Sequence, residues 1–178
     1  GMSDTHFYLP GEKSERLAVV YTHRGGRLER APDGNGMIAQ GTYVGDVRQS
    51  IPAGAGLVST AKDYATFLSM IAAGGRYNGR PLLSPAAHGL MVTDQLDGAA
   101  YPRPGRGFGL GFEVDSGDVE LNEVSWGGAY HTRFWVYPDR GSFAVYLTQV
   151  VPRPRLDDAG LIRRVLRETL TRQPNEGH

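Results

Sequence analysis

The sequence of 178 residues contains no cysteine. This absence excludes disulfide frameworks, thiolate zinc sites and a cysteine nucleophile together. It leaves the cellular compartment open, with the cytoplasm slightly favoured, because a cysteine-free chain folds on either side of a membrane. Apolar runs stay well below the ~20 residues of a membrane span. The first residues, Gly1–Thr5, have neither a charged nor an apolar leader region, so neither a signal peptide nor a membrane span is predicted.

An excess of charge of either sign is also missing. The 19 basic and 19 acidic residues give a formal net charge of zero. This balance argues against a nucleic-acid or acidic-lipid partner that is held by long-range attraction. A small basic cluster near the C-terminus has helical spacing, which is typical of a solvated helix face; its members are Arg163, Arg164, Arg167 and Arg172.

The histidines do not predict a metal centre. None of them has the spacing of a zinc motif, and one lies in the polar tail; they are His6, His23, His88, His131 and His178. We therefore expect neither a metal nor a cofactor.

The middle of the chain predicts two helices after a first fifty residues with little periodicity. Between residues 60 and 73 the apolar side chains recur at i, i+3, i+4 and i+7, which is the spacing of a helix face; they are Tyr64, Phe67, Leu68 and Ile71. Gly74-Gly75 supplies the residue that can adopt positive φ at the helix end. Ser84-Pro85 then predicts an N-cap, and a short helix that continues to about Val92.

The second half predicts an antiparallel sheet and a closing helix. Period-two patterns predict four strands joined by short turns, at residues 108–112, 120–126, 132–137 and 142–150. Asp157 is the expected N-cap of a final helix, whose apolar face comprises Leu161, Ile162, Val165, Leu166 and Leu170. The predicted fold class is α+β, with a meander of about four strands packed by a C-terminal helix and preceded by a small helical and loop region. The domain would span residues 1–172, with a polar tail at 173–178.

Three stretches, in this order, carry a resemblance to a known family. They are GAGLVSTAKDY at Gly54–Tyr64, RPLLSP at Arg80–Pro85, and VSWGG at Val124–Gly128 followed by TRFWV. Together they resemble the serine hydrolases that include class C β-lactamases, DD-peptidases and related esterases. The resemblance runs from residue 1 to about 170. It implies the C-terminal portion of a β-lactamase and penicillin-binding-protein fold.

This resemblance implies a site as well as a fold. Family members acylate a serine in an S-x-x-K motif, helped by a Y-x-N motif, and both normally precede the segment matched here. The third family motif would be Trp126-Gly127-Gly128, with the backbone N–H of Ala129 as one oxyanion donor. Trp126 and His131 would contact the substrate, although the sequence favours a residue of a tight turn as the explanation of His131. The implied substrates are small esters, amides or β-lactams of a longer parent enzyme.

The sequence also contains S-x-x-K itself, at Ser59-Thr60-Ala61-Lys62. A serine one turn from a desolvated lysine is a known acylation arrangement. The local context favours a helix cap, because Ser59 or Thr60 stands at the expected helix start and Asp63 follows as in a capping box. A lysine in the first turn beside an aspartate is expected to stay solvated and cationic, which is the wrong state for a base.

Three interpretations therefore stay open from the sequence. In the first, the chain is the C-terminal portion of a serine hydrolase and is inactive alone. In the second, it is a non-catalytic binding or interaction module, with a homodimer or a covering segment at its exposed sheet edge. In the third, Ser59 and Lys62 work as a pair in a small intact hydrolase.

Overall fold

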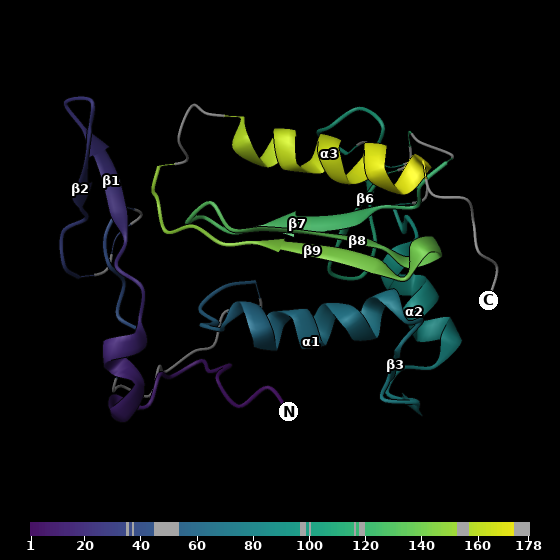
Figure 1. Cartoon of the computed structure of the whole chain (residues 1–178), viewed down its shortest axis with the longest axis horizontal. Coiled ribbons are helices and arrows are strands. Elements are labelled where there is room, and N and C mark those ends of the chain that lie inside the picture. Colours follow the sequence, from purple (N-terminus) through teal and green to yellow (C-terminus); the bar gives the residue numbers. More distant parts are fainter. Residues whose placement is uncertain are drawn as a thin grey trace. The chain divides into compact units, whose positions relative to one another are not determined.

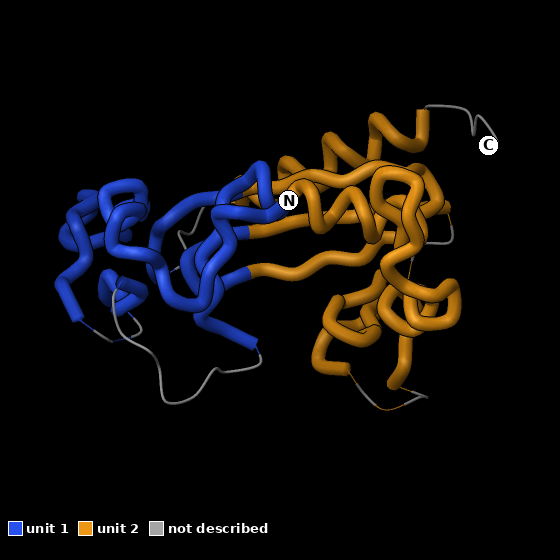
Figure 2. The backbone as a smooth tube through the Cα atoms, turned by 90° about the horizontal axis from the view of Figure 1, so that it is seen from below, with its two compact units in different colours: residues 1–64, 128–132, 147–155 blue, residues 65–127, 133–146, 156–178 orange. Residues whose placement is uncertain are grey.

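The computed structural model describes residues 1–34, 36, 38–44, 54–96, 99, 101–115, 117, 120–152 and 157–172. The chain divides into two compact units, coloured separately in Figure 2. Unit 1 comprises residues 1–64, 128–132 and 147–155, and unit 2 comprises residues 65–127, 133–146 and 156–178. The predicted polar tail, residues 173–178, lies outside the described residues. Within the described part, no helix is both long and apolar enough to cross a membrane.

Unit 1 is built around a hairpin that sequence periodicity did not predict. Its elements are the 3-10 helix η1 (Gly11–Arg16) and the antiparallel strands β1 (Tyr21–Arg24) and β2 (Arg27–Arg30). Val20, Ala31 and Val151 form its small buried cluster. The Gln40 side chain closes the base of the hairpin, because its amide accepts from the Val20 N–H and donates to the carbonyls of Val20 and Ala31. Residues 24–30, which fall in the segment 24–49 expected to be mostly loop, are therefore part of a hairpin.

Unit 2 is a five-stranded antiparallel meander with helices on both faces (Figure 1). The strand order follows the sequence: β5 (Arg106–Phe108), β6 (Glu113–Asp115), β7 (Val124–Gly127), β8 (Arg133–Tyr137) and β9 (Ser142–Tyr146). The helices are α1 (Ala61–Ala72, which begins in unit 1), α2 (Pro85–Val92) and α3 (Asp158–Arg172). The short pieces are the two-stranded pair β3 (Arg76–Tyr77) and β4 (Arg80–Pro81), and the 3-10 turn η2 (Pro138–Arg140). The α+β class predicted from periodicity is confirmed.

The expectation of a single strand over residues 108–112 is wrong. This segment is the turn that joins β5 to β6, closed by the hydrogen bond from the Gly109 N–H to the Phe112 carbonyl at 2.8 Å. Gly111 has a φ of 106°, which excludes it from a strand and favours glycine. The carbonyl of Met91 fills the space that a Cβ at Gly109 would need. The alternation of apolar residues and glycine over 108–112 has the period of a strand, but it lies between two strands. The sheet therefore has five strands where about four were expected.

Helix starts and core positions agree better with the sequence. The Ser84 side chain accepts a hydrogen bond from the Ala87 N–H at 3.1 Å, so α2 begins at the predicted cap. Leu68 and Ile71 of α1 are fully buried, each worth about 1.5–3 kcal/mol of apolar transfer. On the opposite face of the sheet, α3 packs through Ile162, Leu166 and Leu170 against a buried cluster of Leu121, Trp135, Tyr137 and Ala159.

The predicted apolar face of the last helix is partly wrong. Leu161 and Val165 keep 54% and 53% of their surface exposed, so they lie outside the packed stripe. Arg163 and Arg167 occupy inward positions instead, for the reason given below.

Candidate active site

The third-motif residues begin at the end of β7, in unit 2. Val124 and Ser125 are buried, whereas the Trp126 side chain remains 40% exposed. Gly127 lies opposite Arg133 on β8, and a Cβ at Gly127 would come within 2.7 Å of the Arg133 side chain. The Arg133 guanidinium thus covers the backbone of the motif, and glycine leaves room for it.

The remaining motif residues belong to a tight turn in unit 1, Gly128–Thr132. The Gly128 N–H donates to the Thr132 carbonyl at 3.0 Å and to its Oγ1 at 3.2 Å. The His131 N–H donates back to the Gly128 carbonyl at 3.2 Å. His131 has a φ of 64° and is buried, so it takes a conformation that glycine adopts with less strain. This geometry fits a turn residue.

Tyr130 fixes this turn to the rest of unit 1. Its ring packs on the buried cluster of Val20, Ala31 and Val151. Its hydroxyl donates to the Ala39 carbonyl at 3.3 Å, and its own carbonyl accepts from the Val150 N–H at 3.2 Å. The Thr148 hydroxyl adds contacts to the carbonyls of Tyr130 and His131 at 3.3 and 2.9 Å. The turn is therefore held by both its side chain and its backbone.

Ala129, like Gly128 before it, is an exposed residue of this braced turn. Across the part of the chain that the structure describes, no group accepts a hydrogen bond from its N–H. An exposed donor on a rigid turn is what an oxyanion site requires, because it costs no reorganisation when negative charge develops.

Ser59 and Lys62 lie at the start of α1, and the structure confirms the predicted cap. The Thr60 Oγ1 accepts from the Asp63 N–H at 3.2 Å, and the Thr60 carbonyl accepts from the Tyr64 N–H at 2.9 Å. Thr60 is therefore the N-cap. Lys62 is exposed in the first turn.

The Ser59 hydroxyl is part of a polar contact with the N-terminal segment. It lies 2.8 Å from the Thr5 Oγ1, which also donates to the Asp63 carboxylate at 3.1 Å. Asp63 is buried and accepts a further bond from the Asp4 N–H at 2.7 Å. These bonds tie residues 4 and 5 to the helix start, so Ser59 and Asp63 have a structural role.

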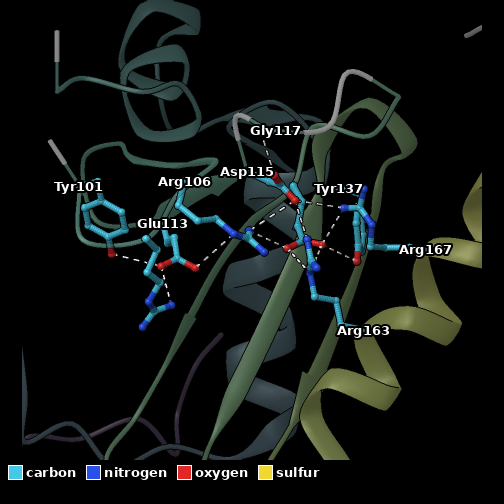
Figure 3. A network of polar contacts seen from close by, with 10 residues as sticks. Tyr101, Arg106, Glu113, Asp115, Gly117, Tyr137, Arg163 and Arg167 are labelled. Carbon is cyan, nitrogen blue, oxygen red and sulfur yellow. Dashed lines mark hydrogen bonds and ion pairs between the residues drawn. The ribbon is translucent and has the colours of Figure 1, made fainter. Parts of the chain in front are cut away.

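A second polar cluster lies in unit 2 between α3 and the sheet (Figure 3). Its centre is Glu123, whose side chain is fully buried. The Arg163 Nε donates to both of its carboxylate oxygens, at 2.8 and 2.9 Å, and Arg167 donates at 3.1 Å. Arg106 donates at 3.3 Å and the Tyr137 hydroxyl at 3.0 Å. The Asp115 carboxylate accepts a hydrogen bond from the Arg163 Nη2 at 2.5 Å.

This network corrects the interpretation of the basic cluster as a solvated helix face. Arg163 and Arg167 turn inward from α3 and are 28% and 16% exposed, whereas Arg172 is 81% exposed. The carboxylates that hold them were not recognised as partners, because Asp115 and Glu123 lie 40 to 52 residues earlier in the chain. The available signal was the i, i+4 spacing of Arg163 and Arg167 beside apolar positions of the helix.

Burial raises the pKa of the Tyr137 hydroxyl well above its ordinary value, and the Glu123 carboxylate raises it further. Burial lowers the pKa of Arg163, but its hydrogen bond to Glu123 and the negative charges of Glu123 and Asp115 together outweigh that effect, and the net shift is upward. Both shifts favour the state with neutral tyrosine and charged arginine. The cluster is therefore best satisfied at neutral pH.

Tyr137 makes the stability of the chain sensitive to alkaline pH. In the unfolded chain its hydroxyl ionises near pH ~10, whereas in the folded chain it stays protonated to higher pH. Its contribution is thus complete below pH ~10 and is lost as the pH rises toward the folded pKa, at a limiting slope of about 1.4 kcal/mol per pH unit. Urea unfolding from neutral pH to above pH ~10 should show a shallower alkaline loss for Tyr137→Phe than for the unmodified chain. Parallel pH profiles would contradict this.

Comparison with known proteins decides the family. The sequence model of the Beta-lactamase family matches residues 1–167. The chain belongs to the Beta-lactamase family. Protein Rv1367c of Mycobacterium tuberculosis strain H37Rv and protein MT1414 of strain CDC 1551 are each 32% identical over 181 residues. These alignments cover 91% of this chain and 43% of each relative, so the chain spans less than half of their length.

Solved structures agree with this membership. EstCE1, described as a hydrolase with promiscuous acyltransferase activity, is 25% identical with a TM-score of 0.60, over 84% of this chain and 42% of EstCE1. Simvastatin synthase (LovD) from Aspergillus terreus shares the fold at 18% identity and a TM-score of 0.63, over 98% of this chain and 47% of LovD. A penicillin-binding protein homolog from Caulobacter crescentus has a TM-score of 0.54 at 20% identity, over 83% of this chain and 43% of its own. The fold is thus related to serine hydrolases, and this chain matches less than half of each solved structure.

Proposed function

We propose that this chain is the C-terminal portion of a serine hydrolase domain that cleaves small esters or amides through an acyl-serine. Residues 1–172 would form this portion. The observation that carries the proposal is the Ala129 N–H, which makes no hydrogen bond within the described part of the chain and belongs to an exposed residue of the braced turn immediately after Trp126-Gly127-Gly128. The hydrolase and acyltransferase description of EstCE1 supports the same chemistry.

In this proposal the two catalytic parts come from different segments. A serine outside the 178 residues gives its hydroxyl proton to the lysine of its S-x-x-K motif and attacks the carbonyl carbon of the substrate, and the carbonyl oxygen becomes an oxyanion. The oxyanion then collapses, the protonated alcohol or amine leaves, and water hydrolyses the acyl-serine. The Ala129 N–H donates a hydrogen bond to that oxyanion. The exposed Trp126 side chain would contact the substrate directly. The His131 side chain is buried, so it would affect the substrate by shaping the turn.

The proposal makes Ser59 inert in the chain of 178 residues. Its hydroxyl bonds to Thr5 and the Thr60 carbonyl at the helix cap, and Lys62 is exposed, whereas the acylation arrangement uses a desolvated lysine. Incubation with a fluorophosphonate probe, followed by mass spectrometry of the intact chain, should show no covalent adduct. An adduct that Ser59→Ala abolishes would establish the Ser59–Lys62 pair as a working nucleophile and overturn this assignment.

The genomic sequence upstream provides the complementary test. An in-frame S-x-x-K followed by Y-x-N would supply the nucleophile that the proposal requires. A natural start codon with neither motif in frame would remove the hydrolase proposal.

A non-catalytic interaction module is the second candidate, and the edge of the sheet favours it. Among the described residues β9 pairs only with β8, and its sequence Ser142–Tyr146 carries no charge that would discourage pairing with another strand. A second copy of the chain would occupy this edge. A dimer in analytical ultracentrifugation would favour this candidate, and a monomer would argue against it.

A further inference from the structure

Three aromatic rings from two parts of the sequence form a row in unit 2. Tyr101 precedes β5, Phe108 ends β5, and Trp126 lies on β7. The ring centroids of Tyr101 and Phe108 are 5.9 Å apart with an interplanar angle of 37°. Those of Phe108 and Trp126 are 5.2 Å apart and nearly perpendicular, at 85°. We call these three residues the aromatic row.

The aromatic row is not required to fill the core. Trp126 keeps 40% of its surface exposed although it lies on the central strand of the sheet, and Phe108 and Tyr101 are half-buried. Trp135, on the neighbouring strand, is 3% exposed and belongs to the buried cluster beneath α3. The sheet thus uses one of its two tryptophans for packing and presents the other at the surface.

The far end of the row is fixed by hydrogen bonds. The Tyr101 hydroxyl donates to the Glu113 carboxylate at 3.1 Å, a contact drawn in Figure 3. Glu113 is buried and also accepts from Arg103 at 2.6 Å. Burial and the neighbouring Glu113 raise the pKa of Tyr101, so its ring stays neutral. The rings are therefore held in place, uncharged, before any ligand arrives.

We infer that the aromatic row is the subsite for an uncharged aryl group of the ester substrate. Stacking on fixed rings favours flat apolar groups. The row reaches the strand that carries the motif, because Trp126 directly precedes Gly127. This inference rests on the proposed hydrolase function, to which it adds the substrate class, and it makes Phe108 and Tyr101 determinants of specificity.

Intrinsic fluorescence tests the subsite on the chain as it stands, because there are only two tryptophans. The probe is 4-nitrophenyl butyl ether, a neutral quencher with no hydrolysable bond. We expect saturable quenching of the exposed Trp126 emission. In Trp126→Phe the remaining emission of the buried Trp135 should be unaffected by the probe, while near-ultraviolet circular dichroism reports that the fold is kept.

Matched variants separate a built subsite from chance collision. Phe108→Leu keeps an apolar side chain but removes the middle ring, and should weaken probe binding about three- to ten-fold. Leu82→Ala, at a position 62% exposed in the same unit, should leave it unchanged. Quenching that rises linearly without saturation, or equal affinity in Phe108→Leu and the unmodified chain, would overturn the inference. Equal affinity for 4-nitrobenzoate would overturn the uncharged substrate class.

The binding test does not depend on a nucleophile. Saturable binding together with an upstream sequence that lacks S-x-x-K would keep the subsite and remove the hydrolase proposal. An in-frame S-x-x-K with no saturable binding would do the reverse.

Discussion

Glu123→Ala is expected to lower the free energy of unfolding by about 3–5 kcal/mol, because it leaves buried guanidinium groups without their carboxylate. Glu123 is fully buried and receives hydrogen bonds from Arg106, Arg163, Arg167 and the Tyr137 hydroxyl. Its removal leaves the guanidinium groups of α3 between the helix and the sheet without this charge partner. Guanidinium chloride unfolding followed by circular dichroism measures the change.

Two variants control this experiment. Glu168→Ala removes an exposed partner of Arg172 at 3.9 Å on the same helix and should change stability by less than about 0.5 kcal/mol. Glu123→Gln keeps the volume and one acceptor oxygen, but it replaces the other oxygen with an NH2 donor and removes the charge; its stability should fall between the two. A Glu123→Ala chain as stable as Glu168→Ala would show that the network contributes no net stability.

Ala129→Pro is expected to reduce kcat about 100- to 1,000-fold in the complete polypeptide that supplies the serine, because proline has no backbone N–H to donate to the oxyanion. The effect should fall on kcat more than on KM, since the lost hydrogen bond strengthens only as negative charge develops. Steady-state kinetics with a chromogenic ester measures both.

Ala129→Gly is the matched control, because it keeps the N–H at the same exposed position. It should retain activity within a few-fold of the unmodified enzyme. A folded Ala129→Pro enzyme with unchanged kcat would show that the oxyanion donor lies elsewhere.

Local chemistry made some elements predictable from the sequence. Ser84-Pro85 places a cap oxygen and a fixed φ at adjacent positions, so the start of α2 needs no tertiary information. Thr60 and Asp63 are separated by one helical turn, and the cap between them forms accordingly. The assignment of Trp126-Gly127-Gly128 to the third motif depends on an order of residues that resembles the family, and it stays a prediction.

Features that depend on distant partners were not predictable in this way. The pattern of α3 shows that Arg163 and Arg167 share a face, but not that Asp115 and Glu123 lie opposite that face and accept their hydrogen bonds. Phe108 and Leu110 alternate with glycines as in a strand, and only the Met91 carbonyl beside Gly109 and the φ of Gly111 show a turn. The contacts among the rings of Tyr101, Phe108 and Trp126 depend on the pairing of β5, β6 and β7 in one sheet.

The bracing of Tyr130 has a consequence for how the protein tolerates change. The turn that presents Ala129 takes its position from Ala39, which is 91 residues away in sequence, and from the cluster of Val20, Ala31 and Val151. Substitutions at these small buried positions would shift an N–H that they never touch. In a mutational scan scored by turnover, the first forty residues would therefore show sensitive positions that a map of distances from the reacting atoms would miss.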